Sequence, residues 1–333
     1  MKTAVIFDTS IASNNMGDEI IVRSAEANLK KLLGNYYKLR YPTHTKAFTA
    51  ISSRTWEKAN LVKNADIKLV IGTDLLWKNM LHPLCLWNIN IFNCSPLAGT
   101  VACGCGCAFE NIKNINLYTK MLYSKVLSHD YVHSTRDEET KVFLEQLGYK
   151  AIVTGCPTLW NLDEEFCSTI PANKSDSVIF TLSGTGKDHI NDQKFINIIR
   201  RNYKKVYFWP QTIFDLDYLN GFENIRGINI VSGDLNVYSD FLANHDVDYV
   251  GTRLHGGIFA MHHRKRAIII AIDHRARNIK LNNNINCVER KKIDKVESMI
   301  NSEFGTNIIL EREKIDKWIN QFGGGVLCNS NIL

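Results

Sequence analysis

Short apolar runs alternate with longer amphipathic segments along the whole chain. The runs that predict strands are 4–7, 68–71, 100–102, 131–133 and 151–153 in the first half, and 178–182, 206–209, 228–231, 249–251 and 267–272 in the second. Helical patterns lie between them, including 17–33, 137–147, 235–244, 255–263, 294–300 and 311–320. Strands that alternate with helices are typical of parallel sheets with crossover helices. The sequence therefore predicts an α/β fold.

The length of the chain predicts two domains, because 333 residues with 45% hydrophobic content exceed one ordinary core. The polar stretch 161–177 predicts a hinge. We expect an N-terminal Rossmann-like domain over 1–165, a C-terminal one over 176–322 and a flexible tail over 323–333. Two such domains would face a central cleft, and ligands of these folds bind at the carboxyl ends of strands.

The charge balance is mildly positive, with 40 Lys and Arg against 34 Asp and Glu. This balance fits an anionic substrate or work beside a membrane, but it lacks the dense basic stripe of a nucleic-acid binder. Nine scattered cysteines do not form a disulfide framework. The chain opens on a strand pattern without a signal peptide, and no run reaches about 20 apolar residues. We expect a cytoplasmic protein that works in solution or at the inner face of the membrane.

The segment between the first strand and its helix carries Asn15, Gly17 and Asp18. Gly17 lets the backbone turn tightly and approach a ligand. Asp18 lies in the first helical turn, where a carboxylate is favourable in any case. Taken alone, this segment is better explained as a helix cap than as a site.

Ser134, Thr135, Arg136 and Asp137 follow the strand predicted at 131–133. An arginine at a helix N-terminus opposes the helix dipole, so capping does not explain it. A planar guanidinium beside free backbone N–H groups can clamp a carboxylate or a phosphate. An arginine paired with a neighbouring carboxylate explains the pattern equally well, and both interpretations stay open.

Gly251 to Gly257 also follow a predicted strand and open a helix. Arg253 and His255 are two residues apart, so both can face one ligand, and Gly256 allows close backbone approach. An anion bound there would favour the charged form of His255, which could then act as a general acid. A structural turn with a satisfied histidine is the alternative. We favour the functional interpretation, because polar residues interrupt an otherwise buried junction.

Three other features suggest sites but are better explained otherwise. The loop 183–188 resembles a phosphate loop but lacks the spacing and the Ser or Thr of a Walker A motif, and a phosphate or sugar loop beside the hinge stays open as an alternative. Cys103, Cys105 and Cys107 lack the spacing of usual zinc sites, so we expect a buried strand end and no metal. The basic run 262–266 ends a helix, where cations suit the dipole, and predicts a solvated face.

Together and in this order, the three strand-end motifs resemble the polysaccharide pyruvyltransferase family. The family's Asn-x-Gly-Asp is matched by Asn15 to Asp18, its Ser-x-Arg-Asp by Ser134 to Asp137, and its Arg-Leu-His by Arg253 to His255. A later strand with an acidic and basic loop is matched by 268–273 with Arg275 and Arg277. The chain departs from the family where many members carry a Gly-Gly pair, since it has Gly72-Thr73-Asp74 there.

The resemblance implies a fold like that of the B-type glycosyltransferases. It implies transfer of pyruvate from phosphoenolpyruvate to a sugar of a cell-surface glycan, as a ketal, with release of phosphate and without a metal or other cofactor. The C-terminal domain would take the donor and the N-terminal domain the acceptor. The donor-binding residues it implies are Ser134, Arg136, Arg253, His255 and Gly256.

On the acceptor side the resemblance implies Asn15, Gly17 and Asp18. His255 would be the catalytic acid and Asp18 a candidate base. The main alternative is a B-type glycosyltransferase with a nucleotide-sugar donor, because the fold cannot separate the two. A non-catalytic glycan-binding protein is a second alternative, and the intact Arg136, Arg253 and His255 argue against it. The acceptor sugar, the linkage and the oligomeric state stay open.

Overall fold

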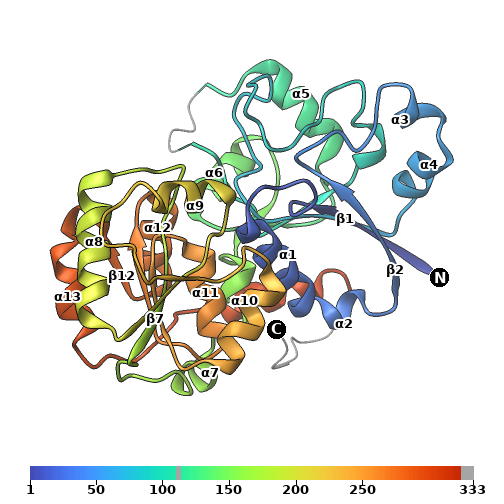
Figure 1. The fold of residues 1–333 in the computed structure, drawn as a ribbon. Coiled ribbons are helices and arrows are strands. Elements are labelled where there is room, and N and C mark those ends of the chain that lie inside the picture. Colours follow the sequence, from blue (N-terminus) through green and yellow to red (C-terminus); the bar gives the residue numbers. More distant parts are fainter. Residues whose placement is uncertain (110–113, 324–333) are drawn as a thin grey trace. The chain divides into compact units, whose positions relative to one another are not determined.

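The computed structural model describes residues 1–109 and 114–323, and the chain divides into two compact units (Figure 1). Of the described residues, the first unit contains Met1–Ser13, Ile21–Trp160 and residues 311–323. The second contains Asn14–Ile20 and Asn161–Leu310. Each unit has its own parallel sheet.

The first unit is built on a four-stranded sheet in the order β2-β1-β3-β4. These strands are β1 (Lys2–Asp8), β2 (Tyr36–Pro42), β3 (Ile67–Ile71) and β4 (Val101–Cys103), and all three pairings are parallel. A parallel pair, β5 (His133–Thr135) and β6 (Ala151–Val153), continues beside β4. Its helices, with α1 from Ile21 on, are α1 (Met16–Asn28), α2 (Lys30–Leu33), α3 (Ser52–Thr55), α4 (Glu57–Lys63), α5 (Leu117–Val126), α6 (Glu138–Gln146) and α14 (Arg312–Asn320).

The second unit is built on a six-stranded sheet in the order β12-β11-β10-β7-β8-β9. The strands are β7 (Ser177–Thr181), β8 (Lys205–Phe208), β9 (Asn229–Ile230), β10 (Asp248–Gly251), β11 (Ala267–Ala271) and β12 (Cys287–Glu289), all paired in parallel. The helices are α7 (Glu164–Ser168), α8 (His189–Asn202), α9 (Ile213–Leu219), α10 (Leu235–Asn244), α11 (Leu254–His262), α12 (His274–Asn283) and α13 (Asp294–Ile300). Helices α8 and α13 cover one face of the sheet, and α10 and α11 the other (Figure 1).

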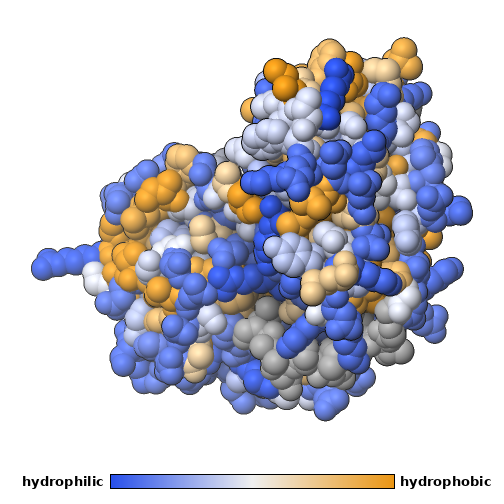
Figure 2. Space-filling view, turned by 90° about the vertical axis from the view of Figure 1, so that its right-hand side faces the viewer, coloured by the Kyte–Doolittle hydropathy of each residue, from blue (hydrophilic) through white to orange (hydrophobic). Residues whose placement is uncertain are grey.

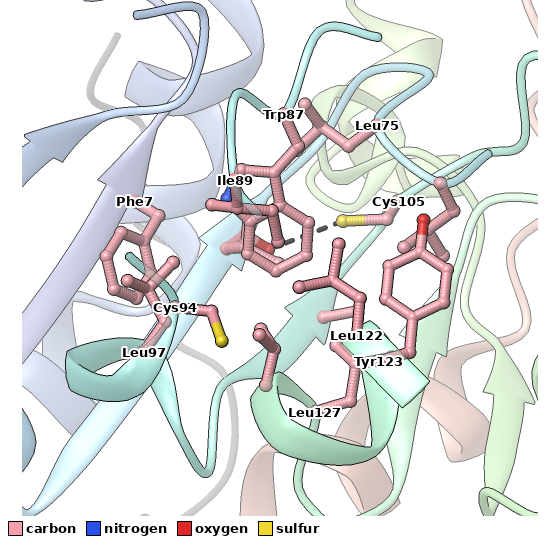
Figure 3. Packing of buried hydrophobic residues seen from close by; sticks show 14 of the residues in the cluster. Phe7, Leu75, Trp87, Ile89, Cys94, Leu97, Cys105, Leu122, Tyr123 and Leu127 are labelled. Atoms are coloured by element: carbon pink, nitrogen blue, oxygen red, sulfur yellow. Dashed lines mark hydrogen bonds between the residues drawn. The ribbon is translucent and has the colours of Figure 1, made fainter. Parts of the chain in front are cut away.

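Burial of the central strands explains why their sequences are continuous apolar runs. All residues of β3 and β11 are buried, as expected for parallel strands covered on both faces. The core of the first unit gathers Phe7, Trp87 and Leu122 among others (Figure 3). The core of the second unit packs α8 and α13 against β7 and β11.

Each strand predicted from an apolar run is present, with its ends shifted by a residue or two. Two strands were missed. Strand β2 lies at the edge of its sheet and is half exposed, so it has no apolar run to reveal it. Strand β12 is a short edge strand. At 131–133 the prediction was early, because the strand is His133–Thr135 and therefore includes Ser134.

Residues 311–323 pack with the first unit, although the sequence analysis assigned residues up to 322 to the second half. Long-range hydrogen bonds explain the difference. The Trp318 indole and the Gln321 amide both donate to the Val132 carbonyl, at 2.8 and 2.9 Å. Trp318 also packs against Trp160, with ring centroids 6.0 Å apart.

Candidate active site

One carboxylate, Asp215, joins three loops at the carboxyl edge of the second sheet. It accepts hydrogen bonds from the backbone N–H groups of Gly184 (2.8 Å), Gln211 (3.1 Å) and Thr212 (3.0 Å), and from the Thr212 hydroxyl (2.9 Å). Gly184 follows β7, Gln211 and Thr212 follow β8, and the third loop, which carries Arg253, follows β10. Asp215 is fully buried, so its charge depends on these partners. Sequence reasoning did not single it out.

Arg253 completes the set of Asp215 partners. Its Nε donates to Asp215 Oδ2 at 2.9 Å, and its Nη2 donates to Asp215 Oδ1 and, at 3.2 Å, to Thr212 Oγ1. Each oxygen of Asp215 thereby accepts from three donors. The two guanidinium nitrogens Nε and Nη2, which could hold an anion at two points, are therefore both bound to Asp215. Within the described residues, Nη1 has no hydrogen-bond partner, so that side of the group is the one that can meet an anion.

The backbone of Arg253 is fixed as well. Its N–H donates to Thr181 Oγ1 at 3.2 Å, and its carbonyl accepts from the Tyr249 hydroxyl at 2.6 Å. The hydroxyl groups of Thr181 and Tyr249 are themselves 2.7 Å apart. Strands β7 and β10 therefore hold the residue that precedes helix α11 in one position.

His255 lies in the first turn of α11 and is 7% exposed. The two glycines that follow it let this turn pack directly on the sheet. A Cβ on Gly257 would lie 2.2 Å from Ile269 Cδ1, and one on Gly256 would lie 3.1 Å from a ring carbon of Trp209. Close packing leaves His255 beside Arg253 at a helix N-terminus, where the partial positive charge favours anions.

The Asn15 to Asp18 segment packs against the loop after β8. The Met16 N–H donates to the Gln211 carbonyl at 3.1 Å, and Gln211 Nε2 donates to Asn15 Oδ1 at 2.6 Å. A Cβ on Gly17 would lie only 2.7 Å from Gln211 Nε2, which accounts for the glycine. Gln211 is a residue that the sequence analysis missed, because its partners are remote in the chain.

Asp18 is buried and occupies the first turn of α1, where its N–H donates to the Asn15 carbonyl at 3.0 Å. Its place in the helix fits the capping interpretation, and its role as a base stays a prediction. Asn15, Gly17, Asp18, Arg253, His255 and Gly256 belong to the second unit, whereas Ser134 and Arg136 belong to the first.

Ser134 is fully buried within β5. Its Oγ accepts from the Gly104 N–H at 2.8 Å and lies 2.5 Å from Thr154 Oγ1. The hydroxyl therefore links the strand to its neighbours, and its implied part in donor binding stays a prediction.

Arg136 is paired with two carboxylates in the first unit. Its Nη2 donates to Asp74 Oδ1 at 2.6 Å, and its Nε donates to Asp137 Oδ2 at 3.3 Å. Burial opposes the charge of Arg136, but the two carboxylates outweigh it and hold the pKa of the guanidinium above its ordinary value. Asp137 also caps α6 by accepting from the Thr140 N–H at 2.9 Å. Arg136 is therefore paired with carboxylates, as one of the two interpretations expected. The other interpretation, a clamp for an anion, would require the anion to share the arginine with them.

A tight turn presents Asp74 to Arg136. Gly72 and Thr73 both have positive φ, +63° and +47°. A β-branched residue such as Thr73 is strained in this conformation. Gly106 lies against the ion pair, since a Cβ there would be 2.4 Å from Arg136 Nη2. The turn therefore carries backbone strain at Thr73 and places Asp74 as a carboxylate partner of Arg136.

Cys103, Cys105 and Cys107 are buried in the first unit. Figure 3 shows Cys105 within the apolar core, where its thiol donates to the Val70 carbonyl at 3.4 Å. Burial raises the pKa of Cys105 to about 12, which disfavours the thiolate that metals bind. Among the described residues, no group of three His, Cys, Asp or Glu side chains could hold a metal ion.

The remaining two sequence features are structural. In the loop 183–188, Gly184 donates to Asp215 and the Gly186 N–H donates to Ser183 Oγ at 3.3 Å.

The basic run 262–266 was expected to be a solvated face, and for Arg266 this was wrong. Arg266 is 2% exposed, pairs with Asp248 at 2.7 Å and donates to the carbonyls of Met299, Ile300 and Ser302.

Two parallel α/β units with functional loops at their strand ends define an enzyme fold in which chemistry is carried by the loops. The family model of the polysaccharide pyruvyl transferases matches residues 15–274, and the chain belongs to this family. It is therefore an enzyme of the transferase class, and its family implies a glycan acceptor. No curated protein matches the chain.

Solved structures share the fold at low sequence identity. A putative UDP-N-acetylglucosamine 2-epimerase from Listeria monocytogenes is 12% identical, with a TM-score of 0.50 and 98% of this chain and 91% of that chain covered. The UDP-GlcNAc 2-epimerase of Methanocaldococcus jannaschii is 15% identical, with a TM-score of 0.48 and coverages of 92% and 95%. An Escherichia coli heptosyltransferase is 12% identical, with a TM-score of 0.38 and coverages of 81% and 88%. The expected α/β fold class is confirmed by the two parallel sheets and is shared with the Listeria monocytogenes structure. No helix of the described residues is both long and apolar enough to cross a membrane.

Proposed function

We propose that the protein transfers pyruvate from phosphoenolpyruvate to a sugar of a cell-surface glycan, as a ketal, with release of phosphate. The observation that carries this proposal is the loop after β10, where Arg253 is held by Asp215 and is followed by His255 in the first turn of α11. Membership of the pyruvyl transferase family supports the reaction class.

Phosphoenolpyruvate carries a carboxylate and a phosphate, which suit this edge of the sheet. Arg253 offers Nη1 beside the first turn of α11, and Gly256 brings the backbone close. Neither arginine of the implied donor set is a free cation, since carboxylates already pair with both. The donor-binding roles implied for Ser134 and Arg136 stay proposals of their own, in which an anion would share Arg136 with Asp74.

The proposed reaction begins with protonation of the donor's methylene carbon by His255. Protonation leaves an oxocarbenium-like carbon, which one sugar hydroxyl attacks while giving its proton to a base. A second hydroxyl then forms its bond to the same carbon as the bond to phosphate breaks, the departing phosphate takes the hydroxyl proton, and the ketal is closed. Asp18 is the proposed base, and Asn15 and Gly17 are proposed to position the acceptor. The arginines and the helix N-terminus stabilise the leaving phosphate, so the scheme uses no metal.

The alternative donor is a nucleotide sugar. This alternative is worth testing because the chain shares its fold with a putative UDP-N-acetylglucosamine 2-epimerase. A thermal-shift panel separates the two, because a ligand that binds only the folded state raises the melting temperature. We expect phosphoenolpyruvate to raise it and UDP-N-acetylglucosamine to leave it unchanged. The reverse result would replace the pyruvyl donor with a nucleotide sugar. We also propose that the protein works in the cytoplasm.

A further inference from the structure

The first unit exposes large apolar side chains on two neighbouring segments, the loop 78–86 after β3 and helix α5. Leu81 and Leu84 on the loop are 64% and 69% exposed, and Leu117 and Met121 on the helix are 80% and 41% exposed. Single exposed residues of this kind are ordinary, but a group of them marks a contact surface.

Hydrogen bonds hold the two segments side by side. Asn116, the N-cap of α5, donates through Nδ2 to Asn79 Oδ1 at 2.6 Å and through its N–H to the Lys78 carbonyl at 3.4 Å. The Met80 N–H donates to Thr119 Oγ1 at 2.8 Å. Figure 2 shows that hydrophobic residues lie among hydrophilic ones on the face of the protein that it presents. The exposed residues of loop and helix therefore belong to one region.

Helix α5 turns an apolar side outward as well as inward. Its buried residues are Thr119, Leu122, Tyr123 and Val126. Leu117 and Met121 are four residues apart, so they lie on one side of the helix, and the exposed Lys120 lies beside them. The outward side of α5 thus combines apolar contact area with positive charge.

The charge of this part of the chain is mainly positive. Between Asp74 and Asp130 the sequence has a single acidic residue, Glu110, and four lysines, Lys78, Lys113, Lys120 and Lys125. Apolar side chains flanked by lysines complement a surface that is anionic outside and apolar beneath, which describes a bilayer containing anionic lipids.

We infer that loop 78–86 and the exposed side of α5 form a docking surface for an anionic lipid bilayer. The leucines enter the interface, and the lysines meet lipid phosphates. A second copy of this chain is a poorer occupant, because it would bring the same lysines together. The inference goes beyond the proposed function and does not depend on the identity of the donor.

The test uses the full chain and sedimentation with vesicles. We expect binding to vesicles that contain phosphatidylglycerol and phosphatidylcholine, little binding to phosphatidylcholine alone, and weaker binding at high salt. Leu117→Ser should lower the partition coefficient about tenfold, the scale of one buried leucine side chain. Lys120→Glu should lower it as well. Leu281→Ser is the matched control, because Leu281 is also 80% exposed but belongs to the second unit.

Equal binding to both vesicle types would overturn the inference, and so would equal losses for Leu117→Ser and Leu281→Ser. A concentration-dependent dimer that Leu117→Ser abolishes, without vesicle binding by the wild type, would assign the surface to self-association. Melting temperatures check that the variants fold. Vesicle binding is scored apart from turnover, so failure of the donor assignment would leave this result standing.

Discussion

Asp215 and Arg253 are joined through two nitrogens of the guanidinium, Nε and Nη2, and Nη1 is the nitrogen that we propose for contact with the donor. The arginine is therefore oriented before any substrate arrives. Orientation in advance spares the entropy of fixing a long side chain on binding, which favours affinity. The cost is that Asp215 neutralises the arginine, so recognition of an anion depends on geometry and on the helix N-terminus more than on net charge.

Replacement of Arg253 by lysine should weaken donor binding. An ammonium cannot make both bonds to Asp215 and still present a nitrogen to the ligand. We expect the affinity for phosphoenolpyruvate to fall by roughly 1.5–3 kcal/mol, the range for charged hydrogen bonds. Calorimetric titration of the folded variant measures this, with the exposed Arg226→Lys as control. An unchanged affinity would remove Arg253 from the donor site.

Asp215→Asn should damage both stability and donor binding. The amide nitrogen cannot accept a hydrogen bond, so the donors that now meet one oxygen lose their acceptor. Breaking a buried ion pair typically costs about 3–5 kcal/mol. The melting temperature should fall, and where the variant folds, KM for the donor should rise more than kcat falls. Asp217→Asn, on the exposed side of the same helix α9, is the control. If both variants behave alike, Asp215 does not position Arg253.

His255→Gln tests the proposed acid. Glutamine keeps the size and part of the hydrogen bonding but cannot deliver a proton. General acid catalysis typically contributes 10²–10⁴-fold, so turnover should fall by about that factor while donor affinity changes much less. His262→Gln, at the other end of α11, serves as control. Near wild-type turnover would pass the acid role to another group, with Asp18 as the next candidate.

Thr73→Gly should stabilise the protein or leave its stability unchanged. A non-glycine residue at positive φ carries roughly 1–3 kcal/mol of strain, which offsets the cost of about 0.5–1 kcal/mol in chain entropy for a glycine. Thr55→Gly, at an ordinary helical position in α3, should destabilise. Urea unfolding of both variants gives the comparison. A clear loss for Thr73→Gly would show that the threonine side chain outweighs the strain.

The protein should become less stable as the pH is lowered, because the buried His133 resists protonation in the folded state. Burial lowers the pKa of this histidine to about 4, and the neutral ring is held between the Ala102 N–H (3.0 Å) and the Ser128 carbonyl (2.9 Å). Its pKa in the unfolded chain is about 6.5, so the unfolded state binds the proton first. Its contribution is complete above about pH 6.5 and is lost as pH falls towards about 4. Urea midpoints across this range should decline less steeply in His133→Asn, and equal slopes would contradict the assignment.

Local pattern was sufficient to predict the buried strands and the loops that follow them, because buried parallel strands are apolar throughout, but it missed the edge strands β2 and β12. It could not reveal Asp215 or Gln211, since their roles arise from partners far away in the chain, such as Arg253 and Asn15. Arg266 was misjudged for the same reason. Its basic neighbours indicated solvent, whereas Asp248 and three distant carbonyls bury it.

A single carboxylate that serves three loops also bears on how this enzyme can change over evolutionary time. Insertions or substitutions in any one of the loops after β7, β8 and β10 are tolerated only if the Asp215 contacts survive in the other two. Variation in substrate preference is then expected to arise by replacing side chains on these loops while their backbones stay fixed. Engineering that grafts a whole loop from a relative would need to carry all three together.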